Sequence, residues 1–125
     1  MTKRILVVED QEDNRRIMRD LLTSAGYALI EATDGEAGVR LAETERPDLI
    51  LMDIQLPVLD GYEATRRIKQ NPELRHIPIV VVTSYALSGD DAKAMAAGSD
   101  AYVAKPFSPR QLLATIRQFL PEAGG

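Results

Sequence analysis

Short apolar segments alternate with helical patterns along this chain of 125 residues. The apolar segments lack the polar–apolar alternation of a strand with one face in water, which favours strands covered on both faces, as in parallel sheets. Between them, apolar residues recur at helical spacing. The candidate strands are 5–8, 27–30, 49–52, 77–82 and 101–104, and the helical stripes are 17–25, 37–42, 64–68, 92–96 and 112–120.

Turn and capping residues divide these segments. Gly26 follows the first helical stripe, Pro47 follows the second, and Asp60 can cap the third. The order predicts an α/β fold of the type (βα)5, in which right-handed crossovers build a doubly wound five-stranded parallel sheet. We expect one domain over residues 1–121, followed by a frayed tail at 122–125.

Composition excludes several classes of protein. The chain has no cysteine, which excludes a disulfide scaffold and any cysteine-based metal site. Its net charge of -4 disfavours a nucleic-acid-binding domain. It shows neither a secretory leader nor an apolar run long enough to cross a membrane. We therefore expect a cytoplasmic protein that contacts neither nucleic acid nor membrane.

Polar residues stand where the predicted strands end. In an open parallel sheet all strands end at one edge, and ligands bind there near the point where the strand order reverses. One small pocket is therefore expected to contain Glu9, Asp10, Asp53, Thr83, Ser84 and Lys105.

The charges of this pocket do not balance. Three carboxylates and the Lys105 ammonium leave a formal charge of about -2, and like charges repel strongly in a partly desolvated site. A hard divalent cation would cancel the excess, and Mg²⁺ suits a site with few protein ligands. A carboxylate could then accept a phosphoryl group whose charge is met by the metal, Lys105 and the Thr83 hydroxyl. The alternative is that these acids only cap helices or face solvent.

The chain resembles the receiver domain of response regulators in two-component signalling, the CheY-like superfamily, over essentially its whole length. This resemblance implies the flavodoxin-like strand order 2-1-3-4-5, which the alternation allows but does not determine. The motifs that carry it are Val7-Val8-Glu9-Asp10, Asp53-Ile54-Gln55-Leu56-Pro57 with Gly61, Val82-Thr83-Ser84, and Lys105-Pro106-Phe107.

The resemblance also implies the metal site. Asp53 would be the phosphoacceptor, and Mg²⁺ would be held by Asp10, Asp53 and the backbone carbonyl of Gln55. Glu9 would lie nearby and act through water. Many relatives carry two aspartates where this chain has Glu9-Asp10, and the longer side chain leaves direct contact of Glu9 with the metal open.

The resemblance further implies a switch. Thr83 and Lys105 would contact the phosphoryl oxygens, and the backbone N–H of Ser84 would approach them. Tyr102 would turn inward when the Thr83 hydroxyl is drawn to the phosphoryl group; the alternative is an edge-strand tyrosine with its hydroxyl in water. The Lys105-Pro106 bond is expected to be cis.

Partners follow from the same resemblance. A sensor histidine kinase or a histidine-phosphotransfer protein would dock on the first helix, where Arg15, Arg16 and Arg19 form a basic patch. Such a patch is equally well a solvated helix face. A downstream protein would bind the fourth helix, fifth strand and fifth helix, and the regulator would be a monomer or a phosphorylation-dependent dimer.

We therefore predict a single-domain response regulator, a phosphoacceptor module and not an enzyme with a separate substrate. No output domain is expected after the last helix. A phosphatase using an aspartyl phosphate is the alternative, but such enzymes carry an acid where Gln55 stands. A nucleotide-binding fold is disfavoured because the acidic run 9–13 would repel a pyrophosphate.

Overall fold

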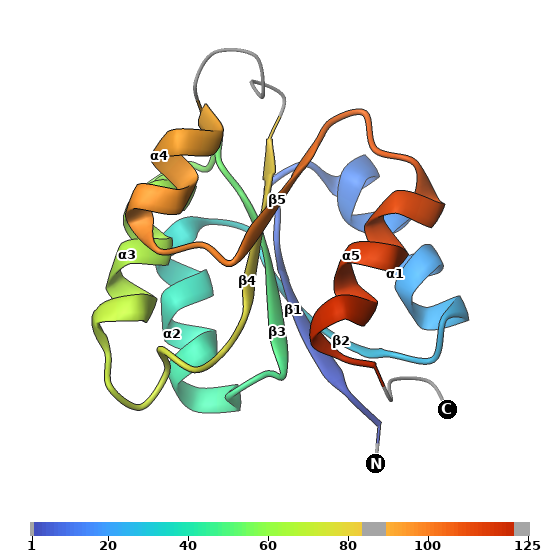
Figure 1. Cartoon of the computed structure of the whole chain (residues 1–125), viewed down its shortest axis with the longest axis horizontal. Helices are drawn as coiled ribbons and strands as arrows, with labels where there is room; N and C mark the ends of the chain where they lie inside the picture. Colours follow the sequence, from blue (N-terminus) through green and yellow to red (C-terminus); the bar gives the residue numbers. More distant parts are fainter. Residues whose placement is uncertain (1, 84–89, 122–125) are drawn as a thin grey trace.

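A five-stranded parallel sheet forms the centre of the structure, a computed structural model that describes residues 2–83 and 90–121 (Figure 1). Its order is β2-β1-β3-β4-β5, and every neighbouring pair of strands is parallel. The predicted α/β class and strand order are therefore confirmed. The strands are β1 (Arg4–Val8), β2 (Ala28–Ala32), β3 (Leu49–Asp53), β4 (Ile79–Thr83) and β5 (Ala101–Ala104).

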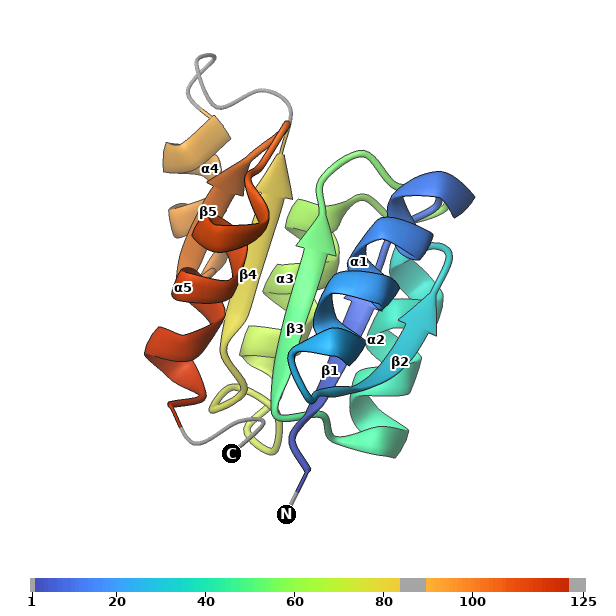
Figure 2. The same ribbon diagram turned by 90° about the vertical axis from the view of Figure 1, so that its right-hand side faces the viewer.

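Helices cover both faces of this sheet. Figures 1 and 2 show α1 and α5 on one face and α2, α3 and α4 on the other. Within the described ranges, no helix has the length and apolar character needed to cross a membrane. The helices are α1 (Glu12–Ser24), α2 (Gly35–Glu45), α3 (Gly61–Gln70), α4 (Asp90–Ala97) and α5 (Pro109–Phe119).

Two apolar clusters form the core, one on each face. Successive side chains of a strand point to opposite faces, so Leu6 and Ile50 pack with α2, α3 and α4, while Ile5 and Leu51 pack with α1 and α5. From Ile5 to Val8 of β1, and throughout β3 and β4, every residue is buried. This explains why these strands are nearly continuous apolar runs.

The edge strands differ from the expectation of full coverage. β2 and β5 keep partly exposed positions because each has a neighbouring strand on only one side. The second strand also begins at Ala28 and not at Tyr27, although the Tyr27 side chain is buried in the core. Ile17, which belongs to the predicted apolar stripe of α1, is 55% exposed. Met18 and Leu22 provide the buried contacts of that helix.

Side-chain caps fix where the helices begin at the carboxyl edge of the sheet. The predicted cap Asp60 accepts a hydrogen bond from the Glu63 N–H at 2.9 Å. Asp34 and Ser108 cap α2 and α5 in the same way. Each cap satisfies a backbone N–H group that the helix leaves without an internal partner.

The opposite edge of the sheet is held by Lys69, at the end of α3. Its ammonium donates to the carbonyl of Ile77 at 2.7 Å, to the carbonyl of Arg75 at 3.1 Å and to the Asp100 carboxylate at 2.8 Å. Asp100 also accepts from the Ile79 N–H at 2.8 Å. Lys69 therefore ties α3 to the start of β4 and to the turn before β5.

We predict that Lys69→Met lowers the free energy of unfolding by about 1–3 kcal/mol, because it leaves two carbonyls and a carboxylate without this donor. Lys93→Met is the matched control, since Lys93 is exposed on α4, and should change stability by less than about 0.5 kcal/mol. Urea denaturation of both variants measures the difference. Equal free energies of unfolding for the two variants would show that the contacts of Lys69 do not stabilise the fold.

Candidate functional site

Functional side chains meet at the carboxyl edge of the sheet. Glu9 and Asp10 directly follow β1, and Asp53 is the last residue of β3. Thr83 ends β4, and Lys105 follows β5. The register places Asp53 beside Val82 and Thr83 beside Ala104, so these ends lie next to one another. Ser84, the remaining predicted member of the pocket, lies outside the described residues.

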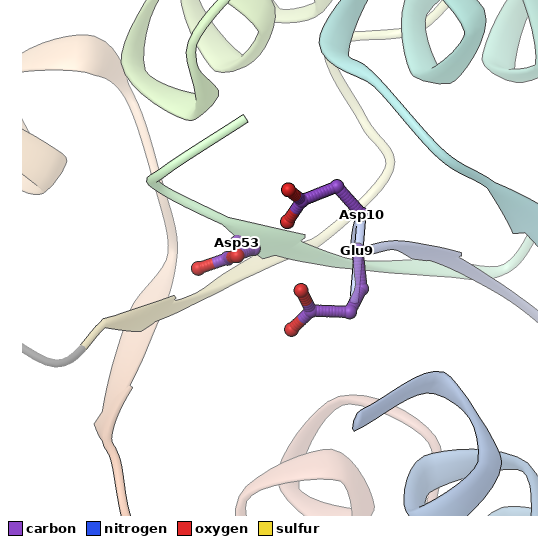
Figure 3. Close-up of side chains that lie close together, drawn as sticks. All are labelled: Glu9, Asp10 and Asp53. Carbon is purple, nitrogen blue, oxygen red and sulfur yellow. The ribbon is translucent and has the colours of Figure 1, made fainter. Parts of the chain in front are cut away.

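The three acids form a compact group (Figure 3). One carboxylate oxygen of each lies within 4.8 Å of the others. Glu9 is fully buried and Asp53 is 6% exposed, whereas Asp10 is more open to solvent. Carboxylate oxygens at this spacing are suited to a hard divalent cation such as Mg²⁺.

Lys105 bridges two of these acids. Its Nζ lies 2.9 Å from Glu9 Oε1 and 3.3 Å from Asp53 Oδ1. The backbone N–H of Lys105 donates to the Thr83 carbonyl at 2.7 Å, and the bond from Lys105 to Pro106 is cis, as predicted. The ends of β1, β3, β4 and β5 are thus linked through one residue.

Both carboxylate oxygens of Glu9 have partners. Oε1 accepts from Lys105, and Oε2 accepts from the Gln11 N–H at 3.1 Å. Glu9 is thus buried and already accepts two hydrogen bonds, whereas Asp10 is the acid of the group that is most open to solvent.

Burial and charge set the ionisation of the group. Burial, followed by the negative charge of Glu9, raises the pKa of Asp53 to about 6. Burial also opposes ionisation of Glu9, but hydrogen bonds from Lys105 and Gln11 outweigh it and lower the pKa of Glu9. Burial opposes the charge of Lys105 as well, yet its acidic partners raise its pKa. Of these three groups, Asp53 is therefore the one whose charged form is disfavoured.

The loop after β3 folds back tightly on the strand end. A Cβ atom at Gly61 would lie 2.1 Å from the carbonyl oxygen of Asp53, so only glycine fits at this position. Val58 adopts a φ of 69° and is 77% exposed. A β-branched residue is strained in this region of backbone conformation. Gln55 is exposed in the same loop, and the tight fold keeps it near Asp53.

The two predicted switch residues differ in exposure. Thr83 is 1% exposed at the end of β4, whereas Tyr102 on the edge strand β5 is 39% exposed. Tyr102 lies beside Val81 in the sheet register, two residues before Thr83. The Tyr102 side chain is thus partly open to solvent, whereas Thr83 is enclosed.

The predicted basic patch on α1 is largely neutralised. Arg19 makes a bidentate ion pair with Glu31 of β2: Nε donates to Oε2 at 2.8 Å, and Nη2 donates to Oε1 at 2.7 Å. Arg15 pairs with Glu12 and lies 3.5 Å from Glu31. Arg16 is exposed. The chain therefore presents less free positive charge on this helix than its sequence suggests.

Two features of the site were not predictable from strand ends alone. Arg15 donates to the backbone carbonyl of Glu9 at 3.0 Å, and Glu31 contacts Arg15 from the neighbouring strand. The sequence signal for the first contact is a basic residue five positions after Asp10, in the first turn or so of the helix that follows. The contact itself depends on how α1 packs against β2.

We predict that Asp53→Asn stabilises the metal-free protein above pH 7. Folded Asp53 keeps its proton up to about pH 6, whereas the unfolded chain loses it near 3.8, so the free energy of unfolding falls as pH rises between these values. The gain should be about 1–3 kcal/mol above pH 7 and should vanish below pH 4. Thermal melts in EDTA measure it, with exposed Asp20→Asn as the control for net charge. A gain that is independent of pH would exclude this cause.

Known proteins are similar to this chain in sequence. Residues 5–117 match the model of the response regulator receiver domain family. The polar-differentiation response regulator DivK of Brucella ovis is 43% identical over 123 residues, which cover 98% of this chain and all of that protein.

Solved structures agree in fold. The receiver domain of a sensor histidine kinase from Pseudomonas aeruginosa, with magnesium coordinated in its active-site cleft, is 40% identical and superposes with a TM-score of 0.91 over 98% of this chain and all of that one. The chemotaxis regulator CheY4 of Vibrio cholerae is 27% identical with a TM-score of 0.89, over 95% of this chain and 99% of that one. A family match over most of the sequence and this shared architecture lead to one conclusion: the chain belongs to the response regulator receiver domains.

Proposed function

We propose that this receiver domain takes a phosphoryl group onto Asp53 from the phosphohistidine of a sensor kinase or a phosphotransfer protein. The observation that carries the proposal is the buried acidic group at the strand ends, bridged by Lys105. The Asp53 carboxylate can act as the nucleophile, and the Lys105 ammonium beside it can pair with the negative charge of the phosphoryl group that it receives. The domain would extend over residues 1–121 and would act in the cytoplasm.

The metal of this site is proposed to be Mg²⁺. Asp10, Asp53 and the backbone carbonyl of Gln55 would bind the ion directly. Glu9 would contact it through water. The donor set of carboxylate oxygens supports this assignment. When bound, Mg²⁺ supplies positive charge that offsets the charge of the acids and of the incoming phosphoryl group.

In the transfer step, an oxygen of Asp53 attacks the phosphorus of the phosphohistidine. The new O–P bond forms as the P–N bond breaks, and the electron pair of that bond stays on the imidazole nitrogen. Lys105, already 3.3 Å from Asp53, pairs with a phosphoryl oxygen, and the Thr83 hydroxyl donates to another. The Ser84 N–H would support the same oxygens. Water later hydrolyses the acyl phosphate and restores Asp53, so no separate substrate is turned over.

Phosphorylation would change a surface distant from Asp53. Movement of Thr83 toward the phosphoryl group leaves space beside β4, and Tyr102 turns from its exposed position into that space. Tyr102 belongs to the proposed output face of α4, β5 and α5. Met95, 56% exposed on α4, gives this face an apolar contact for a downstream protein. The free domain would be a monomer, or a dimer formed on phosphorylation.

The donor protein would dock on α1 and the β5–α5 loop. A groove of about 450 Å³ lies there, next to the phosphoacceptor pocket, because Lys105 belongs to both. Ile17, Pro106 and Phe107 give the groove an apolar lining. This supports a largely apolar docking contact on α1, with less electrostatic attraction than the arginines alone suggest.

The first test is phosphorylation by a small donor. Incubation with acetyl phosphate and Mg²⁺ should add one phosphoryl group, seen by intact mass, and Asp53→Asn should abolish this addition because an amide cannot form the acyl phosphate. EDTA should suppress labelling of the wild type. Undiminished labelling of Asp53→Asn would place the acceptor elsewhere and would overturn the proposal.

The second test separates docking from chemistry. Ile17→Glu should slow phosphotransfer from a histidine-phosphotransfer domain that phosphorylates the wild type, by about tenfold, because it puts a charge into an apolar contact. Its labelling by acetyl phosphate should not change. Met95→Glu is the matched control, since Met95 has nearly the same exposure on the far side of the sheet. Equal slowing by both variants would rule out this groove as the docking site.

A further inference from the structure

Arg15 of α1 contacts the backbone that carries the acidic pair. Its Nη1 donates to the carbonyl of Glu9 at 3.0 Å. The same guanidinium pairs with Glu12 and lies 3.5 Å from Glu31. Only 12% of the Arg15 side chain is exposed. The Arg15 side chain is therefore largely enclosed and its guanidinium contacts three acceptors, unlike a free surface charge.

The peptide groups on both sides of Glu9 are held by hydrogen bonds. The Glu9 N–H donates to the carbonyl of Ala32, the last residue of β2, at 3.0 Å. The Glu9 carbonyl, beyond the last residue of β1, accepts from Arg15. These two bonds fix the peptide planes from which the side chains of Glu9 and Asp10 project. Loss of the Arg15 bond would free the plane between these two acids.

The arginine is itself held in place by Glu31. Arg19 binds this carboxylate with two short hydrogen bonds, which orient it on the edge strand. Glu31 in turn faces Arg15 through Oε1. The hydrogen bonds from Arg19 lower the pKa of Glu31 and outweigh its burial, which opposes ionisation, so the carboxylate stays charged. The network connects α1, β2 and the end of β1.

We propose that Arg15 is a positioning residue of the acidic site, which holds the Glu9 carbonyl so that Glu9 and Asp10 present their carboxylates to a divalent cation. The proposal rests on the metal site of the proposed function and adds a residue that touches neither metal nor phosphoryl group. Groups that orient metal ligands commonly change metal affinity by one to two orders of magnitude.

An electrostatic role and a positioning role predict opposite effects of removing Arg15 on the affinity for a cation. If Arg15 acted only through its positive charge, its removal would strengthen the binding of a cation. If it acts by holding the Glu9 carbonyl, its removal weakens binding because the acidic pair loses its fixed orientation. The sign of the change therefore distinguishes the two.

The experiment is a calorimetric titration of the metal-free full chain with MgCl₂. Arg15→Ala should bind Mg²⁺ about tenfold more weakly than the wild type. Arg15→Lys keeps the charge but not the planar fork, and should also bind more weakly. Arg16→Ala is the matched control, because Arg16 is the exposed neighbour on the same helix; its Mg²⁺ affinity should equal or slightly exceed that of the wild type. In EDTA, backbone amide resonances of Asp10 and Gln11 should shift in Arg15→Ala and stay in place in Arg16→Ala.

Arg15→Ala that binds Mg²⁺ as tightly as the wild type, or more tightly, overturns the proposal. If Arg15→Ala does not fold, the Mg²⁺ affinity of Arg15→Lys serves as the test, and binding as tight as that of the wild type overturns the proposal. A wild type that binds no Mg²⁺ would instead refute the metal site of the proposed function, and the inference about Arg15 with it. The two failures are therefore distinguishable.

Discussion

The rest of the site depends on the ion pairs of one ammonium, Lys105, with two carboxylates buried at the strand ends. Without this bridge, Glu9 and Asp53 would be adjacent like charges in a region shielded from water, a situation that proteins avoid. Lys105 offsets that repulsion only in part, because the pKa of Asp53 is still raised to about 6. The remaining excess of negative charge favours the binding of a cation in this pocket.

A well-packed interior stabilises the fold against the repulsion between these acids. The buried strands β1 and β3 carry the acids, and the two apolar clusters on either side of the sheet fix the positions of these strands. The loop after β3, in which Val58 adopts a φ of 69°, is a second local cost near the acids. Such costs concentrate where a protein is built for binding, and favourable packing elsewhere offsets them.

Much of the fold could be predicted, and the errors have physical causes. The alternation of apolar runs and helical stripes identified every strand, because a parallel sheet covered on both faces leaves a simple pattern. Ile17 belongs to the apolar stripe of α1 yet lines an exposed groove, because helical spacing cannot tell a core stripe from the rim of a groove. The arginines of α1 suggested a free basic patch because a sequence does not show that Glu31, on a different strand, faces two of them.

The sequence by itself determined the order of elements, the residues at each strand end and the acidic excess among them. These are local properties: side-chain type, periodicity and the position of turn residues along the chain. Only the tertiary structure decided that Lys105 pairs with Glu9, a residue 96 positions away, and that Arg15 binds the Glu9 carbonyl. Such pairings depend on the register of the sheet and on how α1 packs against β2. A shift of a few ångströms would break them without changing the pattern of apolar and polar residues.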